Sequence, residues 1–151
     1  MVISEPSNPW VSGVAGLFTG EFYDFVHSHL ADDGLFVQWV QAYEINDALV
    51  AKVVAAMLSR FEYVEVYVTN QSDLLLIASA RPLPAFDYAR MDTPGLRAEL
   101  ARVGLRDADA FAFRRLGGRE VLAAFARANG GTGHSDYFCL LYTSPSRRTR
   151  G

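Results

Sequence analysis

The chain has 151 residues, of which 50% are hydrophobic and 21% are charged, a composition typical of one globular domain and not of a disordered segment. Fourteen basic residues against 17 acidic ones give a formal charge of −3, which argues against a nucleic-acid-binding surface. No apolar run reaches the roughly 20 residues of a membrane helix, because Lys52 interrupts the best candidate, and no signal peptide opens the chain. We therefore expect a cytoplasmic domain.

Periodicity in the first third of the chain predicts two strands joined by a helix. Met1–Glu5 and Leu35–Val40 are short apolar runs that favour buried strands. Between them an apolar stripe at helical spacing predicts a helix, with Thr19 suited to its first turn. The residues of that stripe are Leu17, Phe18, Phe22, Phe25, Val26 and Leu30.

The next third predicts a second helix and a hairpin. Asn46 and Asp47 suit the cap of a helix whose apolar residues repeat as far as Phe61. Val64–Thr69 and Leu74–Ser79 are two β-rich runs, and the link between them is too short for a parallel crossover. We expect them to pair as an antiparallel hairpin.

Beyond residue 81 the pattern predicts a helical C-terminal extension, residues 82–138. Pro94–Val103, Asp107–Leu116 and Gly118–Ala128 look helical, and glycines separate them. Residues 139–151 carry three Arg and no acid, and they resemble translated sequencing-adapter DNA. We expect that tail to be non-native or disordered.

The element order β-α-β-α-β-β predicts an α/β fold, the C-terminal half of a methyltransferase-like Rossmann sheet that ends in an antiparallel hairpin and is followed by helices. Residues 1–81 would form a partial Rossmann-like catalytic domain. No G-x-G-x-x-G turn is present to receive a nucleotide or adenosyl group. The chain is therefore expected to be a fragment that lacks an upstream half, so that its first strand would be central in the intact sheet.

Ligands of open α/β sheets bind beyond the carboxyl ends of the strands, which directs attention to two loops. In the first, Glu5 leaves the strand and is followed by Ser7, Asn8 and Trp10 between two prolines. A carboxylate there can accept a proton or bind an ammonium group. The alternative is a solvated strand-end acid with Trp10 packing on the loop.

The second loop is taken with the end of the second strand, and this stretch carries Gln38, Gln41, Tyr43 and Glu44. Aromatic and acidic groups together suit an amine cation. Strand alternation places Gln38 on the opposite side from Gln41, so these residues cannot all face one site. Glu44 could equally serve the first turn of the following helix.

The EPSNPW and QWVQAYE segments together resemble the spermidine synthase family, particularly bacterial spermidine-synthase-like domains fused to membrane segments. The resemblance covers about residues 1–138. It implies an aminopropyltransferase that uses decarboxylated S-adenosylmethionine as co-substrate, without a metal, and that binds it mainly through an upstream half.

The same resemblance assigns roles to individual residues. The family has two Asp at the strand end, the first helping to deprotonate the attacking amine and the second binding the substrate. Glu5 and Asn8 stand at those positions here, which makes Glu5 the catalytic candidate. Ser7, Asn8, Trp10, Gln38, Gln41 and Tyr43 would bind a small amine.

Two other readings stay open. Asn8-Pro9-Trp10 also resembles the Asn-Pro-Pro-aromatic motif of amino-group methyltransferases, although the second Pro is absent. A non-catalytic ligand-binding domain attached to a membrane protein is the other alternative, on the cytoplasmic side of the membrane. A homodimer is compatible with each reading. The three His residues form no metal set. We expect the chain by itself to bind S-adenosyl compounds weakly at best and to transfer nothing.

Overall fold

The computed structural model describes residues 1–6, 13–42, 45–69 and 73–131. Within these ranges the chain forms a five-stranded mixed sheet in the order β1-β2-β4-β3-β5. Its strands are β1 (Val2–Ser4), β2 (Phe36–Gln41), β3 (Tyr63–Val68), β4 (Asp73–Ser79) and β5 (Arg115–Gly118). The pair β1/β2 is parallel and the pair β3/β4 is antiparallel, as the sequence predicted. The predicted α/β fold is confirmed.

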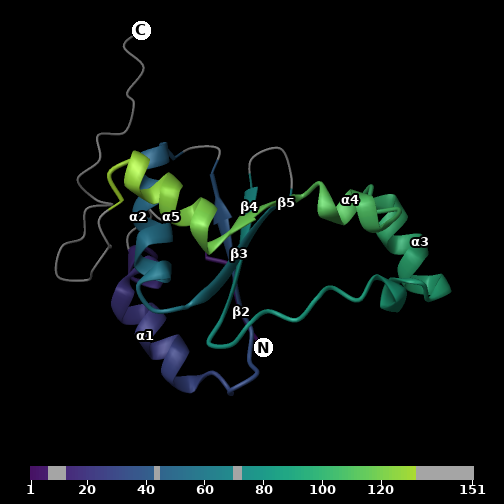
Figure 1. The fold of residues 1–151 in the computed structure, drawn as a ribbon, viewed down its shortest axis with the longest axis horizontal. Coiled ribbons are helices and arrows are strands. Elements are labelled where there is room, and N and C mark those ends of the chain that lie inside the picture. Colours follow the sequence, from purple (N-terminus) through teal and green to yellow (C-terminus); the bar gives the residue numbers. More distant parts are fainter. Residues whose placement is uncertain (7–12, 43–44, 70–72, 132–151) are drawn as a thin grey trace, which may run out of the picture.

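One face of the sheet is covered by helices. Phe36, Gln38 and Val40 of β2 are buried, while the residues between them are half-buried. Helices α1 (Gly20–His29), α2 (Asp47–Leu58) and α5 (Arg119–Ala128) lie together on the buried side (Figure 1). At the centre of this core the Phe36 ring stacks on that of Phe61 at 5.8 Å between centroids. Burial of such rings is a main source of the free energy that holds the helices against the sheet.

Helix α1 begins after Thr19, whose hydroxyl oxygen accepts a hydrogen bond from the Phe22 amide. The helix buries Tyr23 and Val26, three residues apart, against the sheet. The prediction that Phe25 belongs to the buried stripe is wrong, since its side chain is 61% exposed and its ring packs on His29 instead. Phe25 follows Tyr23 by two residues, which places it on nearly the opposite side of the helix. The two side chains therefore cannot both face the core.

Helix α2 is the central helix of the covered layer. Asn46 accepts a hydrogen bond from the Leu49 amide and so caps the first turn, as predicted. At the other end the guanidinium of Arg119, from the start of α5, donates to the carbonyls of Leu58, Phe61 and Glu62. The carbonyl of Leu58 is one that the end of α2 leaves free, whereas Phe61 and Glu62 lie in the turn between α2 and β3. Arg119 therefore ties both the end of α2 and the following turn to α5.

Residues 82–114 form a projecting segment, here called the arm. It contains the short 3-10 helix η2 (Tyr88–Met91) and the helices α3 (Pro94–Arg102) and α4 (Ala108–Ala112). None of these three elements buries a residue. Figure 1 shows α3 and α4 standing away from the sheet, on the side opposite α1, α2 and α5.

Strand β5 corrects the sequence prediction for the segment that follows the arm. Residues up to Leu116 were expected to be helical, but α4 ends at Ala112 and Arg115–Gly118 pairs antiparallel with β3. A four-residue run with two glycines has no strand signal of its own, so the free edge of β3 decides its conformation. Gly117 suits this place because a Cβ there would come within 2.7 Å of Val121 Cβ. The predicted extension is therefore not wholly helical. Its strand β5 belongs to the sheet, and its helix α5 belongs to the helices that cover the sheet.

Candidate functional site

Glu5 follows β1 directly, at the carboxyl end of the parallel strand pair. Its side chain is exposed, whereas the next residue, Pro6, is buried. A buried proline fixes the direction in which the chain leaves the strand. The Glu5 carboxylate is thus exposed to solvent, while the backbone on either side of it is fixed by β1 and by the buried Pro6. Ser7, Asn8 and Trp10, the other candidates of this loop, lie outside the described residues.

Gln41 is the last residue of β2 and lies at the same end of the sheet as Glu5. It pairs in register with Asp73 of β4 and is half-buried, on the sheet face that the helices leave uncovered. Trp39 lies on that face too, two residues earlier. The carboxyl ends of parallel strands lie at the same end of the sheet. Glu5 and Gln41 are therefore brought to that common end. Tyr43 lies outside the described residues.

Gln38 is placed differently from Gln41. Its side chain is fully buried beneath the helices, and its Oε1 accepts a hydrogen bond of 2.6 Å from the Tyr23 hydroxyl. Its Nε2 donates to the carbonyl of Leu17 at 2.9 Å. The amide is therefore engaged within the protein, and contact between Gln38 and a substrate stays a prediction.

Sequence reasoning missed the partnership of Tyr23 with Gln38. A signal was present, because Gln38 alternates with the apolar residues Phe36 and Val40 on one face of the strand, and a Gln buried there needs a polar partner inside the core. Burial also raises the pKa of the Tyr23 hydroxyl well above its usual range, so that it stays protonated and donates.

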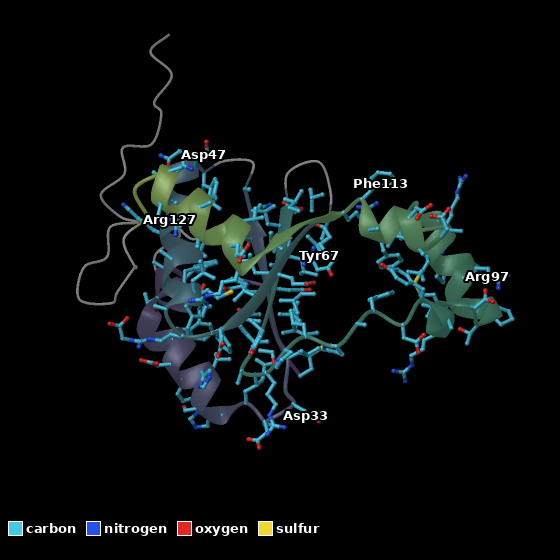
Figure 2. All side chains as sticks on the ribbon, in the orientation of Figure 1. Asp33, Asp47, Tyr67, Arg97, Phe113 and Arg127 are labelled. Atoms are coloured by element: carbon cyan, nitrogen blue, oxygen red, sulfur yellow. The ribbon has the colours of Figure 1, made fainter. Side chains whose placement is uncertain are left out.

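The uncovered face of the sheet carries a second polar network. The Glu65 carboxylate on β3 accepts from the Tyr67 hydroxyl at 2.7 Å and from the Arg115 guanidinium of β5 at 2.7 Å. The hydrogen bond from Arg115 lowers the pKa of Glu65. Partial burial and the bond to Glu65 raise the pKa of Tyr67 to about 12. Figure 2 shows Tyr67 on the side of the sheet that faces the arm.

These three side chains are partners of one another, which favours a structural role. The network joins the last strand to the sheet through side chains as well as through the backbone. It lies on β3 and β5, whereas the candidate residue Glu5 follows β1 and Gln41 is the last residue of β2. The network is therefore separate from the candidate site.

A surface hollow of about 510 Å³ lies within the arm. Its lining combines apolar residues with two Arg and two Asp, and it includes none of the residues that the sequence selected. The lining residues are Tyr88, Ala89, Met91, Asp92, Arg97, Leu100, Leu105, Arg106, Asp107 and Ala108. Arg97 and Asp92 form an ion pair with each other there.

The described part of the chain shows no group of three or more His, Cys, Asp or Glu side chains able to hold a metal ion. Across the same residues, no helix has both the length and the apolar character needed to cross a membrane.

No protein-family model matches the chain, and no curated protein matches it in sequence. Among solved structures it matches the crystal structure of a probable spermidine synthase from Corynebacterium glutamicum, with a TM-score of 0.50 and 18% sequence identity. The chain shares that Rossmann-like fold. The match covers 80% of this chain and 41% of the neighbour, so the chain spans about two fifths of that protein's length.

Proposed function

We propose that the chain carries the amine-binding part of an aminopropyltransferase-like enzyme, with Glu5 as the base. The observation that carries the proposal is the position of Glu5. It is an exposed carboxylate at the carboxyl end of a parallel strand, where sheets of this class bind ligands. The fold shared with a probable spermidine synthase supports the choice of reaction.

The reaction requires a neutral amine to attack the methylene group beside a sulfonium ion. The nitrogen forms a new bond to that carbon, the carbon–sulfur bond breaks, and a neutral thioether leaves. A primary amine is protonated near neutral pH, so a fixed carboxylate that accepts its proton frees the lone pair for attack. Glu5 would take that proton, and its negative charge would also attract the amine.

The remaining contacts to the amine are proposed from the loops that follow β1 and β2. Ser7, Asn8 and Trp10 come directly after Glu5, and Gln41 and Tyr43 come from the end of β2. Asn8 stands where the family that this chain resembles has an Asp, which leaves one negative charge fewer for a diamine. We therefore propose a small amine as the substrate class.

Decarboxylated S-adenosylmethionine is the proposed co-substrate. The chain holds no G-x-G-x-x-G turn and matches only 41% of its structural neighbour. We propose that residues other than those of this chain make most of the contacts to the adenosyl group. The enzyme would then be a longer product of the reading frame that encodes this chain.

Amino-group methylation is the second candidate, favoured by the Asn8-Pro9-Trp10 sequence. In such enzymes an amide and a backbone carbonyl orient the target nitrogen. The two reactions differ in the donor that they consume. Incubation of the full-length product with S-adenosylmethionine and with its decarboxylated form, in parallel, separates them.

The base is tested by Glu5→Gln in the full-length product. The amide keeps the size of the side chain but has little proton affinity, so turnover should fall by about 100-fold or more while donor binding is retained. Glu62→Gln is the matched control, because Glu62 is an exposed acid that follows α2. If Glu5→Gln keeps most of the turnover, Glu5 is structural. That result would favour the methyltransferase or the non-catalytic ligand-binding domain over the proposed function.

A further inference from the structure

Three elements meet at the side chain of Gln38. The residue belongs to β2, its partner Tyr23 belongs to α1, and its other partner is the backbone of Leu17 in the 3-10 helix η1 (Ala15–Phe18). Tyr23 and Gln38 are both fully buried. Each polar atom of the Gln38 amide therefore has one partner, and the donor and acceptor roles fix the orientation of the amide.

The network lies next to the candidate base in the sheet. Gln38 pairs in register with Ser4, the last residue of β1, which immediately precedes Glu5. The segment that leaves the sheet at Glu5 reaches η1 before α1 begins. Its first residue after Glu5, Pro6, is buried, and η1 buries Ala15 and Phe18. The two described ends of this connection, Pro6 and η1, are therefore both packed in the protein.

The bond from Gln38 ties η1 to the sheet, whereas other contacts tie η1 to α1. The Thr19 hydroxyl donates to the Gly16 carbonyl at 2.9 Å and accepts from the Phe22 amide. Those bonds would keep the end of η1 on α1 even if η1 shifted relative to β2. The Gln38 bond at Leu17 opposes such a shift directly.

A polar pair at this place is hard to explain by stability alone. Replacing both partners of a buried hydrogen bond with apolar groups of similar shape is often nearly neutral for folding. A hydrogen bond is directional, however, and a fully satisfied buried network selects one arrangement of the elements that it joins. Apolar packing between η1 and β2 would tolerate sliding.

We propose that Tyr23 and Gln38 are positioning residues, which fix η1 against β2 and thereby set where the connection that begins at Glu5 must end. The proposal rests on the proposed function for what that segment does. It also revises the expected role of Gln38, which would act on the amine through the loop.

The first test uses amide hydrogen exchange in the purified chain. Tyr23→Phe removes one hydroxyl and leaves Gln38 Oε1 without its donor. Exchange at residues 15–19 should rise by about tenfold beyond the change seen across the sheet. Ser79→Ala is the matched control, because the buried Ser79 hydroxyl donates to the Gly34 carbonyl near the opposite end of β2. It should leave residues 15–19 unchanged relative to the sheet.

The double variant Tyr23→Phe with Gln38→Leu separates positioning from stability. It removes both side-chain partners, so it should recover thermal stability relative to Tyr23→Phe. Leu17 is partly exposed, which lets its carbonyl turn to water. Exchange at residues 15–19 should nevertheless stay fast. If protection recovers together with stability, or if Tyr23→Phe never lowers it, the positioning role is wrong.

A functional test measures binding of a small amine, 1-aminobutane, by the chain. Tyr23→Phe and the double variant should both weaken binding by about tenfold, because a displaced site loses most of its alignment, while Ser79→Ala should not. Equal binding by all variants would overturn the link to the site. If the unaltered chain does not bind the amine, the proposed function loses support, and the exchange measurements still decide whether the network positions η1.

Discussion

Replacing Arg119 with alanine should lower the free energy of unfolding of the sheet and its covering helices, although Arg119 is an exposed surface residue. Its guanidinium donates to the carbonyls of Phe61 at 2.6 Å, of Leu58 at 3.1 Å and of Glu62 at 3.4 Å. It thereby connects the first residue of α5 to the end of α2. A cation at the carboxyl end of a helix also interacts favourably with the helix dipole.

The expected magnitude follows from these three bonds. A hydrogen bond to a charged group contributes about 1.5–3 kcal/mol when it is well shielded. Arg119 is exposed and its longest bond is marginal, so we expect a total loss of about 1–2 kcal/mol in the free energy of unfolding. For a chain of this size that corresponds to a fall of about 3–6 °C in Tm.

Urea denaturation followed by circular dichroism measures this loss. Arg119→Lys keeps the charge but not the planar fork of donors, so it should fall between the alanine variant and the unaltered chain. Arg102→Ala is the control, since Arg102 forms an exposed ion pair with Glu99 and should cost less than about 0.5 kcal/mol. An Arg119→Ala variant no less stable than Arg102→Ala would refute the capping role.

Two further predictions concern the pH dependence of the sheet and its open edge. The pKa of Glu65 is lower in the folded chain than its ordinary value of 4.5, so its contribution to stability is present above that value and is lost as pH falls through the lowered folded pKa. Glu65→Gln should therefore make the midpoint of urea denaturation less dependent on pH in this acidic range, and an unchanged dependence would contradict the assignment. The second prediction rests on β1, which forms one edge of the sheet and leaves Ile3 57% exposed, so the isolated chain should self-associate through that edge. Ile3→Lys should reduce the mass measured by light scattering after size-exclusion chromatography, whereas equal masses for both chains would show that association, if any, uses another surface.

Local patterns in the sequence were sufficient for the elements with strong periodicity. Apolar residues at helical spacing after Asn46 predicted α2, and two β-rich runs joined by a short link predicted the β3/β4 hairpin. The parallel pairing of β1 with β2 followed from the helix between them. In each case the information lies within a few neighbouring residues, because capping, periodicity and loop length are local properties. The position of Glu5 at a strand end was available in the same way.

Other features depended on which surfaces meet in three dimensions. Whether Tyr23 or Phe25 faces the core depends on how α1 is rotated against the sheet, and the stripe predicted from the sequence included Phe25 and left out Tyr23. Strand β5 forms because β3 offers it a free edge, which its own four residues do not reveal.

The candidate site divides along the same line. Strand alternation in the sequence already separated Gln38 from Gln41, and the burial pattern of β2 confirms that they lie on opposite faces. Which of the two faces would be covered was decided by the packing of α1, α2 and α5. Because a buried amide must find partners inside the protein, that packing joined Gln38 to Tyr23 and Leu17, which lie 15 and 21 residues away in the sequence. No local pattern specifies such a contact, since it exists only when strand β2, helix α1 and the 3-10 helix η1 come together.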